Sequence, residues 1–97
     1  KAACEALALT LAKEEQKNGI RVNIVAPSLT VSDMGEKLAK AVAGVSDIHE
    51  LDKSFPFGRV SVPEDVAAAV VWLVSPANAY ASGQKINIDG GGMATLK

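Results

Sequence analysis

The chain opens with apolar residues at helical spacing. Ala3, Leu7 and Leu11 lie four residues apart in a segment rich in Ala and Leu. This spacing predicts a helix over residues 2–17. Asn18-Gly19 tolerates left-handed backbone angles, so we expect the helix to stop there.

The period then changes from helical to alternating. Ile20, Val22 and Ile24 alternate with polar residues before Ala26. That pattern predicts a strand that enters a mostly buried sheet and is ended by Pro27.

The middle of the chain is less regular. Apolar residues at helical spacing predict a modest helix over 36–45, and the segment 44–62 has no period, which predicts a long connection of a functional or mobile kind. His49 has no second His or Cys to share a metal, so we expect it to be solvated. Three carboxylates in this segment are interpreted as surface charges: Asp47, Glu50 and Asp52.

A third helix follows with a recognisable start. Ser61 and Glu64 match a capping box, and Pro63 lies in the first turn, where a missing amide costs little. Residues 66–74 are apolar on every side, so this helix must be covered on more than one face. Ser75-Pro76 is predicted to end it.

A second strand closes the pattern. Ile86 and Ile88 share one face of the segment 84–89, and three glycines follow it as a chain reversal. Strand, helix and strand form a βαβ unit, which predicts two parallel strands with a right-handed connection. Two parallel strands do not make a stable sheet alone. We therefore expect further strands and helices outside these 97 residues.

Composition narrows the classes of function. The 97 residues allow one small domain with no internal repeat, 48% of them are hydrophobic and 4% aromatic, and the formal charge is -1. That balance provides no basic surface for nucleic acid or for an anionic membrane. The longest apolar run, 66–74, is far shorter than the ~20 residues that span a bilayer.

Cys4 is the single cysteine of the chain. It excludes an internal disulfide and any multi-cysteine metal site, and it fits a reducing compartment, so we expect a cytoplasmic protein. Its predicted role is that of a small buried hydrophobe. No glycine-rich phosphate loop and no Ser-His-Asp arrangement is present, so the residues alone indicate only part of a larger α/β protein.

Six short sequence motifs, in the same order along the chain, indicate more than composition and periodicity do. They are Lys1-Ala2-Ala3, 19–23 with Ala26-Pro27, Phe57-Gly58-Arg59, 63–67, Leu73-Val74-Ser75, and Gly83-Gln84 with Asp89-Gly90-Gly91. Together they resemble the second half of a short-chain dehydrogenase/reductase. The resemblance implies that residues 1–97 are the C-terminal part of one Rossmann-like, doubly wound parallel α/β domain, arranged as helix, strand, loop with small helix, helix and strand.

Lys1 matches the lysine of that family's Y-x-x-x-K motif. The resemblance implies that its ammonium holds the nicotinamide ribose hydroxyls and lowers the pKa of a catalytic tyrosine four residues earlier. The tyrosine, the catalytic serine, the helix asparagine and the dinucleotide loop are absent from these residues.

The loop from Pro27 to Ser32 matches the family's P-G-x-x-x-T cofactor contact. Ser28 replaces the usual glycine, so we expect a strained backbone there. The resemblance implies that Pro27 and Ser28 border the cofactor, that the Thr30 backbone meets the nicotinamide carboxamide, and that the Ser32 hydroxyl contacts the cofactor. Alternatively these residues only cap the next helix. Residues 28–57 match the segment that covers cofactor and substrate.

The implied activity is hydride transfer between NAD or NADP and a small carbonyl or alcohol substrate. Two phrases, Asp33-Met34 and Asp89-Gly90-Gly91, favour a 3-oxoacyl-carrier-protein reductase or a sugar or polyol dehydrogenase. The alternative is a binding or structural relative without a working active site. We expect the 97 residues alone to be inactive and to self-associate, since relatives form dimers or tetramers through the first helix and the last strand.

Overall fold

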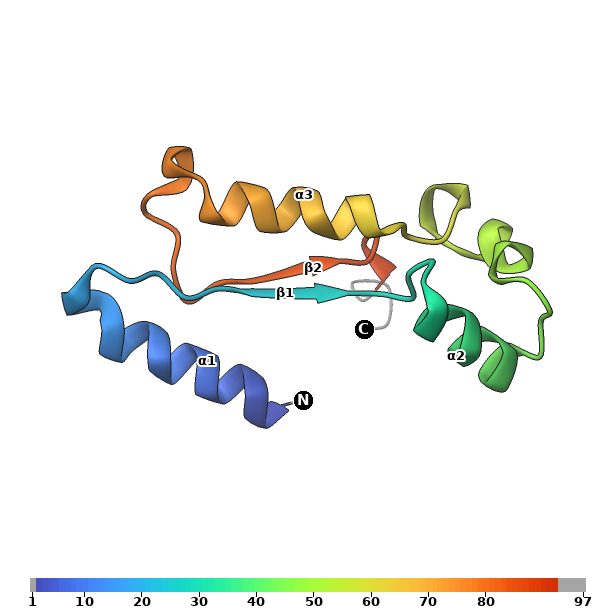
Figure 1. Ribbon diagram of the computed structural model, residues 1–97, viewed down its shortest axis with the longest axis horizontal. Helices are drawn as coiled ribbons and strands as arrows, with labels where there is room; N and C mark the ends of the chain where they lie inside the picture. Colours follow the sequence, from blue (N-terminus) through green and yellow to red (C-terminus); the bar gives the residue numbers. More distant parts are fainter. Residues whose placement is uncertain (1, 93–97) are drawn as a thin grey trace.

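The structure, a computed structural model, describes residues 2–92. Two strands and three α-helices in that range alternate with four short 3-10 helices (Figure 1). The main elements are α1 (Ala2–Glu15), β1 (Ile24–Pro27), α2 (Asp33–Ala43), α3 (Pro63–Val74) and β2 (Lys85–Ile88). The helix and strand order predicted from the periodicity is therefore correct.

The strands pair in parallel, from Ile24 opposite Lys85 to Pro27 opposite Ile88. Figure 1 shows α1 and α3 on opposite sides of this pair, with α2 and the 3-10 helices Ile48–Ser54 and Pro56–Gly58 beyond the carboxyl ends of the strands. The parallel βαβ unit and the α/β class are confirmed. The described chain is elongated, with extents of 49 × 28 × 28 Å.

β1 begins at Ile24, later than the alternating pattern predicted. The side chains of the two polar residues before it, Arg21 and Asn23, bond to the end of α3 and to the segment that follows it. Arg21 Nη1 donates to the carbonyls of Leu73 at 2.8 Å and Ala81 at 3.1 Å, and Asn23 Nδ2 donates to the Ala81 carbonyl at 3.0 Å. The guanidinium thus meets the negative end of α3, while a backbone bond from the Gly83 amide to the Val22 carbonyl at 2.7 Å still joins the two segments before Ile24.

The segment 44–62 is not the irregular connection that its lack of period predicted. It contains 3-10 helices at Ile48–Ser54 and Pro56–Gly58. Ile48 and Val60 are each 1% exposed and form, with Ala39, the buried cluster of the described residues. Single 3-10 turns are too short to produce a detectable period, so the sequence pattern missed the core that they build.

The start of α3 also differs from the prediction. Its capping carboxylate is Asp65, whose Oδ2 accepts from the Val62 amide at 2.8 Å, and not Glu64. Ser61 donates weakly to the same oxygen at 3.5 Å instead of accepting from the helix. The helix begins at Pro63, one residue later than a Ser61 cap requires, and the capping carboxylate moves by one residue with it.

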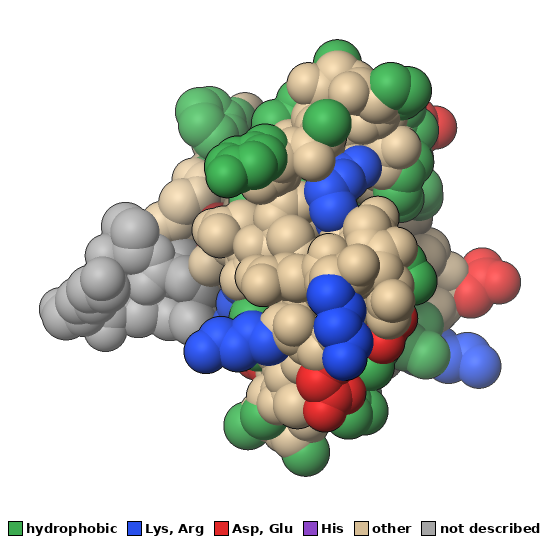
Figure 2. Space-filling model, turned by 90° about the vertical axis from the view of Figure 1, so that its left-hand side faces the viewer, with side chains coloured by type: hydrophobic (Ala, Val, Ile, Leu, Met, Phe, Trp, Pro, Cys, Tyr) green, Lys and Arg blue, Asp and Glu red, His purple; other side chains and the backbone are tan. Residues whose placement is uncertain are grey.

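Both outer helices keep apolar side chains in solvent. Leu7 of α1 is 66% exposed and Val71 of α3 is 64% exposed. Cys4 is exposed too, so the prediction of a buried thiol is wrong. It lies on α1, where Ala12 is the buried residue. Figure 2 shows apolar side chains at both the top and the bottom of the face at the amino ends of the strands.

Candidate functional site

The loop after β1 and the turn after β2 meet at the carboxyl ends of the two strands. The Ser28 amide donates to the Ile88 carbonyl at 3.1 Å, which extends the ladder by one rung. The Asp89 carboxylate accepts from the Gly91 amide at 2.9 Å and so shapes the turn. In open parallel sheets ligands bind beyond this end of the strands. The predicted cofactor loop therefore lies at the ligand-binding end of the fold.

The backbone at Ser28 is not strained. Phe57 is the only non-glycine with positive φ among the described residues, so the strain predicted at Ser28 is wrong. The chain turns here because the Thr30 hydroxyl donates to the Ser28 carbonyl at 2.8 Å. A local bond from a side chain to the backbone forms this turn without glycine's angles.

Thr30 is held by its neighbours while its own amide stays available. The Val31 amide donates to the Ser61 carbonyl at 2.8 Å, and Thr30 and Ser61 form an isolated parallel bridge. Within residues 2–92 no group accepts from the Thr30 amide. The bridge fixes this N–H next to the strand end, where it can donate to a bound group.

Ser32 begins α2. Its Oγ accepts from the Gly35 amide at 3.0 Å and donates to the Thr30 carbonyl at 3.3 Å. A Cβ on Gly35 would lie 1.9 Å from the Thr30 carbonyl oxygen, so only glycine permits this approach of helix to loop. Sequence reasoning missed Gly35, although glycine in a first helical turn, where most residues are more stable, is a signal.

Four of the five predicted site residues therefore share one short loop: Pro27, Ser28, Thr30 and Ser32. Ser32 has the capping role that the alternative interpretation assigned to it. A cap at 3.0 Å does not exclude a second contact, because a hydroxyl oxygen has two lone pairs. The cofactor roles of the four stay predictions, and Lys1 lies outside the described residues.

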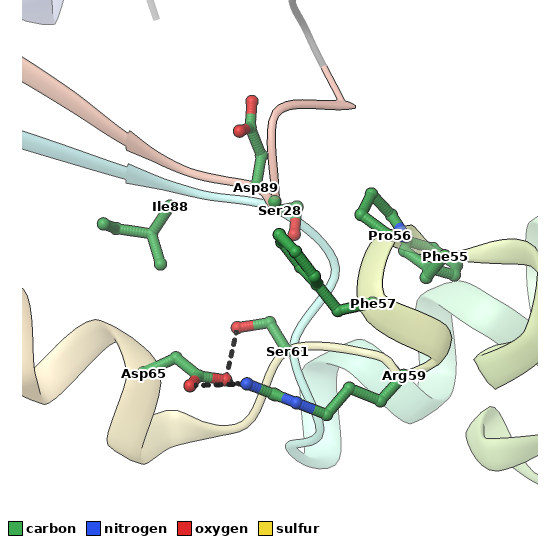
Figure 3. A pocket seen from close by; sticks show the side chains of 10 residues that line it. Ser28, Phe55, Pro56, Phe57, Arg59, Ser61, Asp65, Ile88 and Asp89 are labelled. Carbon is green, nitrogen blue, oxygen red and sulfur yellow. Dashed lines mark hydrogen bonds and ion pairs between the residues drawn. The ribbon is translucent and has the colours of Figure 1, made fainter.

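An open cleft of about 240 Å³ adjoins this loop. Figure 3 shows the Phe57 ring reaching into the space between Ser28 and Ser61, with the Ile88 side chain on the opposite side. The cleft thus has apolar walls and hydroxyl groups. Its remaining lining residues are Phe55, Pro56, Arg59, Asp65, Asp89 and Gly90.

An ion pair forms one end of the cleft. Arg59 Nη1 and Nη2 lie 2.6 and 3.0 Å from the two Asp65 carboxylate oxygens. The Arg59 guanidinium, followed by the Val62 amide, lowers the pKa of Asp65 to about 2. Asp65 in turn raises the pKa of Arg59. Both groups stay ionised near neutral pH and cancel each other's charge.

The carboxylates of the middle segment accept hydrogen bonds from backbone amides, so they are not free surface charges. Glu50 Oε2 accepts from the Ser46 hydroxyl at 2.8 Å and from the Asp47 amide at 2.9 Å. The Ser46 hydroxyl makes the largest contribution to lowering the Glu50 pKa. Asp47 accepts from the His49 amide at 3.0 Å and caps the 3-10 helix Ile48–Ser54.

Asp52 joins that helix to the core. Its Oδ1 accepts from the Val60 amide at 2.9 Å, which is the main cause of its lowered pKa. Its Oδ2 lies 3.2 Å from His49 Nδ1, so the imidazole has a partner and is not merely solvated. The described residues hold no group of three metal-ligating side chains.

Comparison with known proteins identifies the family. The family model described as Enoyl-(Acyl carrier protein) reductase matches residues 1–93. The chain belongs to the short-chain dehydrogenase/reductase family. This confirms the resemblance drawn from the six motifs, including the assignment to the C-terminal portion of the family's fold.

Individual relatives agree. The chain is 40% identical over 90 residues to a 3alpha-hydroxysteroid dehydrogenase of Mediterraneibacter gnavus, covering 93% of this chain and 34% of the relative. It is 37% identical over 81 residues to a 3-oxoacyl-acyl-carrier-protein reductase of Chlamydia trachomatis, covering 84% and 31%. The chain spans about a third of the length of these curated relatives.

A solved structure confirms the fold. A short chain dehydrogenase family protein from Francisella tularensis superposes with a TM-score of 0.84 at 32% identity, covering 97% of this chain and 41% of that protein. The helices and strands described above are thus part of a short-chain dehydrogenase/reductase Rossmann fold. Between residues 2 and 92, no helix is both long and apolar enough to cross a membrane.

Proposed function

We propose that this chain is part of a longer NAD(P)-dependent oxidoreductase that interconverts a carbonyl and an alcohol by hydride transfer. The observation that carries the proposal is the loop from Pro27 to Ser32. It places the unpartnered Thr30 amide and the Ser32 hydroxyl at the carboxyl end of a parallel strand, in a member of an oxidoreductase family. We also propose a cytoplasmic homo-oligomer, in keeping with the expectations from sequence.

The loop fits a nicotinamide group. The Thr30 N–H can donate to a carboxamide oxygen, since the described residues offer it no acceptor. The Ser32 hydroxyl lies on the same loop, and Pro27 and Ser28 line an open space that Asn87 of β2 also lines. Bound nicotinamide would accept or supply the hydride.

The chain's own residues would position the cofactor and the substrate and would stabilise the ionised form of the tyrosine. In this proposal Lys1 holds the ribose hydroxyls and stabilises the ionised form of a neighbouring tyrosine, which exchanges the proton with the substrate oxygen. The Thr30 amide orients the carboxamide and so fixes which face of the ring meets the substrate. Residues 33–57 cover the substrate and exclude water.

The decisive experiment replaces Lys1 by methionine in the full-length protein that carries this chain. We expect the rate of NADH- or NADPH-dependent carbonyl reduction to fall by orders of magnitude, because the tyrosine loses its electrostatic support. Lys17→Met, at an exposed lysine after α1, is the matched control. Near-normal activity of Lys1→Met would refute the role assigned to Lys1, whereas no activity in the unaltered full-length protein would favour a non-catalytic relative.

A second measurement concerns the 97 residues by themselves. Without the dinucleotide loop and the tyrosine, we expect no measurable binding of NADH by fluorescence titration and no turnover. Nicotinamide-dependent activity of the isolated chain would contradict this part of the proposal.

A further inference from the structure

Phe57 combines two unusual properties. Its φ of 61° lies in the left-handed region that bulky side chains avoid, and its side chain is 88% exposed. Such a backbone conformation is unfavourable and persists only where surrounding contacts enforce it. An aromatic ring can be exposed to solvent without a left-handed backbone conformation. The contacts that hold Phe57 in this conformation therefore indicate its role.

Those contacts come from the turn after β2. A Cβ on Gly90 would lie 2.6 Å from Pro56 Cβ and 3.5 Å from Phe57 Cδ2, so Pro56 and Phe57 are seated directly on this glycine. The Gly90 φ of 64° suits glycine as well. The aromatic turn is therefore fixed against the carboxyl end of the sheet, with the ring reaching into the cleft (Figure 3).

The cleft walls define the shape of an occupant. The Phe57 ring and the Ile88 side chain face each other across it, and the Ser28 and Ser61 hydroxyls border the space between them (Figure 3). A volume of about 240 Å³ suits one or two fused rings. Flat apolar groups gain most from a stacking aromatic wall.

The charged groups that line the cleft already have partners, so they do not favour a charged occupant. Both oxygens of Asp65 are bonded to Arg59, so the guanidinium is neutralised before any ligand arrives. An anion would have to displace this bidentate pair, and the Asp89 carboxylate, which also lines the cleft, already accepts from the Gly91 amide at 2.9 Å. The Ser28 hydroxyl borders the cleft and is a polar group that a ligand can meet there.

We propose that this cleft binds an uncharged, flat, largely apolar portion of the substrate that carries a hydroxyl or carbonyl group. Phe57 stacks on the flat face, and the Ser28 hydroxyl bonds to the polar group. The identity of the ligand as substrate rests on the proposed oxidoreductase function. Binding itself does not, and it can be measured without turnover.

The test uses 6-bromo-2-naphthol as the probe with the full-length protein that carries this chain. Its dissociation constant is measured by calorimetry, and its bromine is located by anomalous scattering in a soaked crystal. We expect bromine density between Phe57 and Ile88. Stacking contributes enough for Phe57→Ala to weaken binding roughly two- to tenfold, while Phe57→Tyr restores it.

Two further variants sharpen the result. Ser28→Ala should weaken binding by about two- to tenfold, the usual effect of one lost hydrogen bond. Tyr80→Ala is the matched control, since this aromatic residue is fully exposed and lies outside the cleft. We expect its affinity to equal that of the unaltered protein. The charged analogue 6-bromo-2-naphthoate should bind at least about tenfold more weakly, because Arg59 is already paired.

Three outcomes overturn the proposal: no binding, bromine density elsewhere, or equal affinities in Phe57→Ala and Tyr80→Ala. Tighter binding of the naphthoate would overturn the uncharged ligand class. Carbonyl reduction is assayed in the same preparations. Loss of activity in Lys1→Met with no probe binding refutes the cleft alone, and probe binding without any activity refutes the oxidoreductase proposal alone.

Discussion

Individual residues decide the shape of the candidate site. Gly35 allows the first turn of α2 to approach the Thr30 carbonyl, and Asp65 holds both the start of α3 and the Arg59 guanidinium. Gly35 belongs to none of the six family motifs, and Asp65 lies in the motif 63–67 but was not predicted to be the cap. Each of the two residues positions a neighbouring group. Its replacement should therefore lower the free energy of unfolding, whether or not activity changes.

Gly35→Ala should destabilise the protein. Alanine normally stabilises a helix interior by about 1 kcal/mol over glycine. Here the added Cβ would meet the Thr30 carbonyl oxygen at 1.9 Å, and the movement it forces should cost about 1–3 kcal/mol. Urea unfolding measures the difference. Gly92→Ala, where a Cβ has nothing within 4 Å, is the control, and a stabilised Gly35→Ala variant would contradict the observed packing.

Asp65 should make stability depend on pH in the acid range. Its folded pKa of about 2 lies below the ordinary 3.8, so the folded state binds fewer protons than the unfolded state between these values. The stabilisation is present above 3.8 and is lost as the pH falls through about 2.

Asp65→Asn should therefore lower the urea midpoint near neutral pH and reduce its further decline in acid. Glu64→Gln is the matched control, because Glu64 is the carboxylate that the sequence wrongly selected as the cap. If the two variants behave alike at both pH values, Asp65 does not have the structural role assigned to it.

At the scale of elements, α2 depends on its first residues more than on its apolar face. Ser32 provides the cap, Gly35 the close approach, and Gly44 ends the helix at a φ of 69°. The periodic pattern located this helix but began it at Glu36, since its first turn, from Asp33, carries no apolar period. Capping contacts are local, but their geometry depends on the preceding loop, which the pattern does not describe.

Ser32 variants separate capping from cofactor binding. Ser32→Ala should cost about 0.5–2 kcal/mol in unfolding free energy, whereas Ser32→Asp, which also caps, should be close to neutral. If the hydroxyl also contacts the cofactor, both variants should raise KM for the nicotinamide cofactor. A normal KM in the stable Ser32→Asp variant would limit Ser32 to its capping role.

At the scale of the whole molecule, the uncovered faces of α1 and α3 are the main feature. Leu7, Val71 and Val74 are all at least 64% exposed, while the buried cluster lies at the other end, around Ile48 and Val60. Apolar surface of this extent favours association. The 97 residues alone should therefore self-associate.

Light scattering of the isolated chain should give a mass above the 10.0 kDa of one copy. Val71→Lys should lower that mass, because a lysine on the open face of α3 resists burial. Val42→Lys is the control, as Val42 is 78% exposed on α2, away from both outer helices. A monomeric mass for the unaltered chain would contradict the expectation.

The sequence by itself determined the type and order of the main elements, because these depend on residues close together in the chain, and the order in turn implied the parallel pairing. Periodicity reports a local conformation, and a βαβ order admits few topologies. Only the tertiary structure decided that Arg21 bonds to the end of α3, since Leu73 lies 52 positions away in the chain. It also decided the core at Ile48 and the cleft beside Phe57, because these require segments without a period to meet in space.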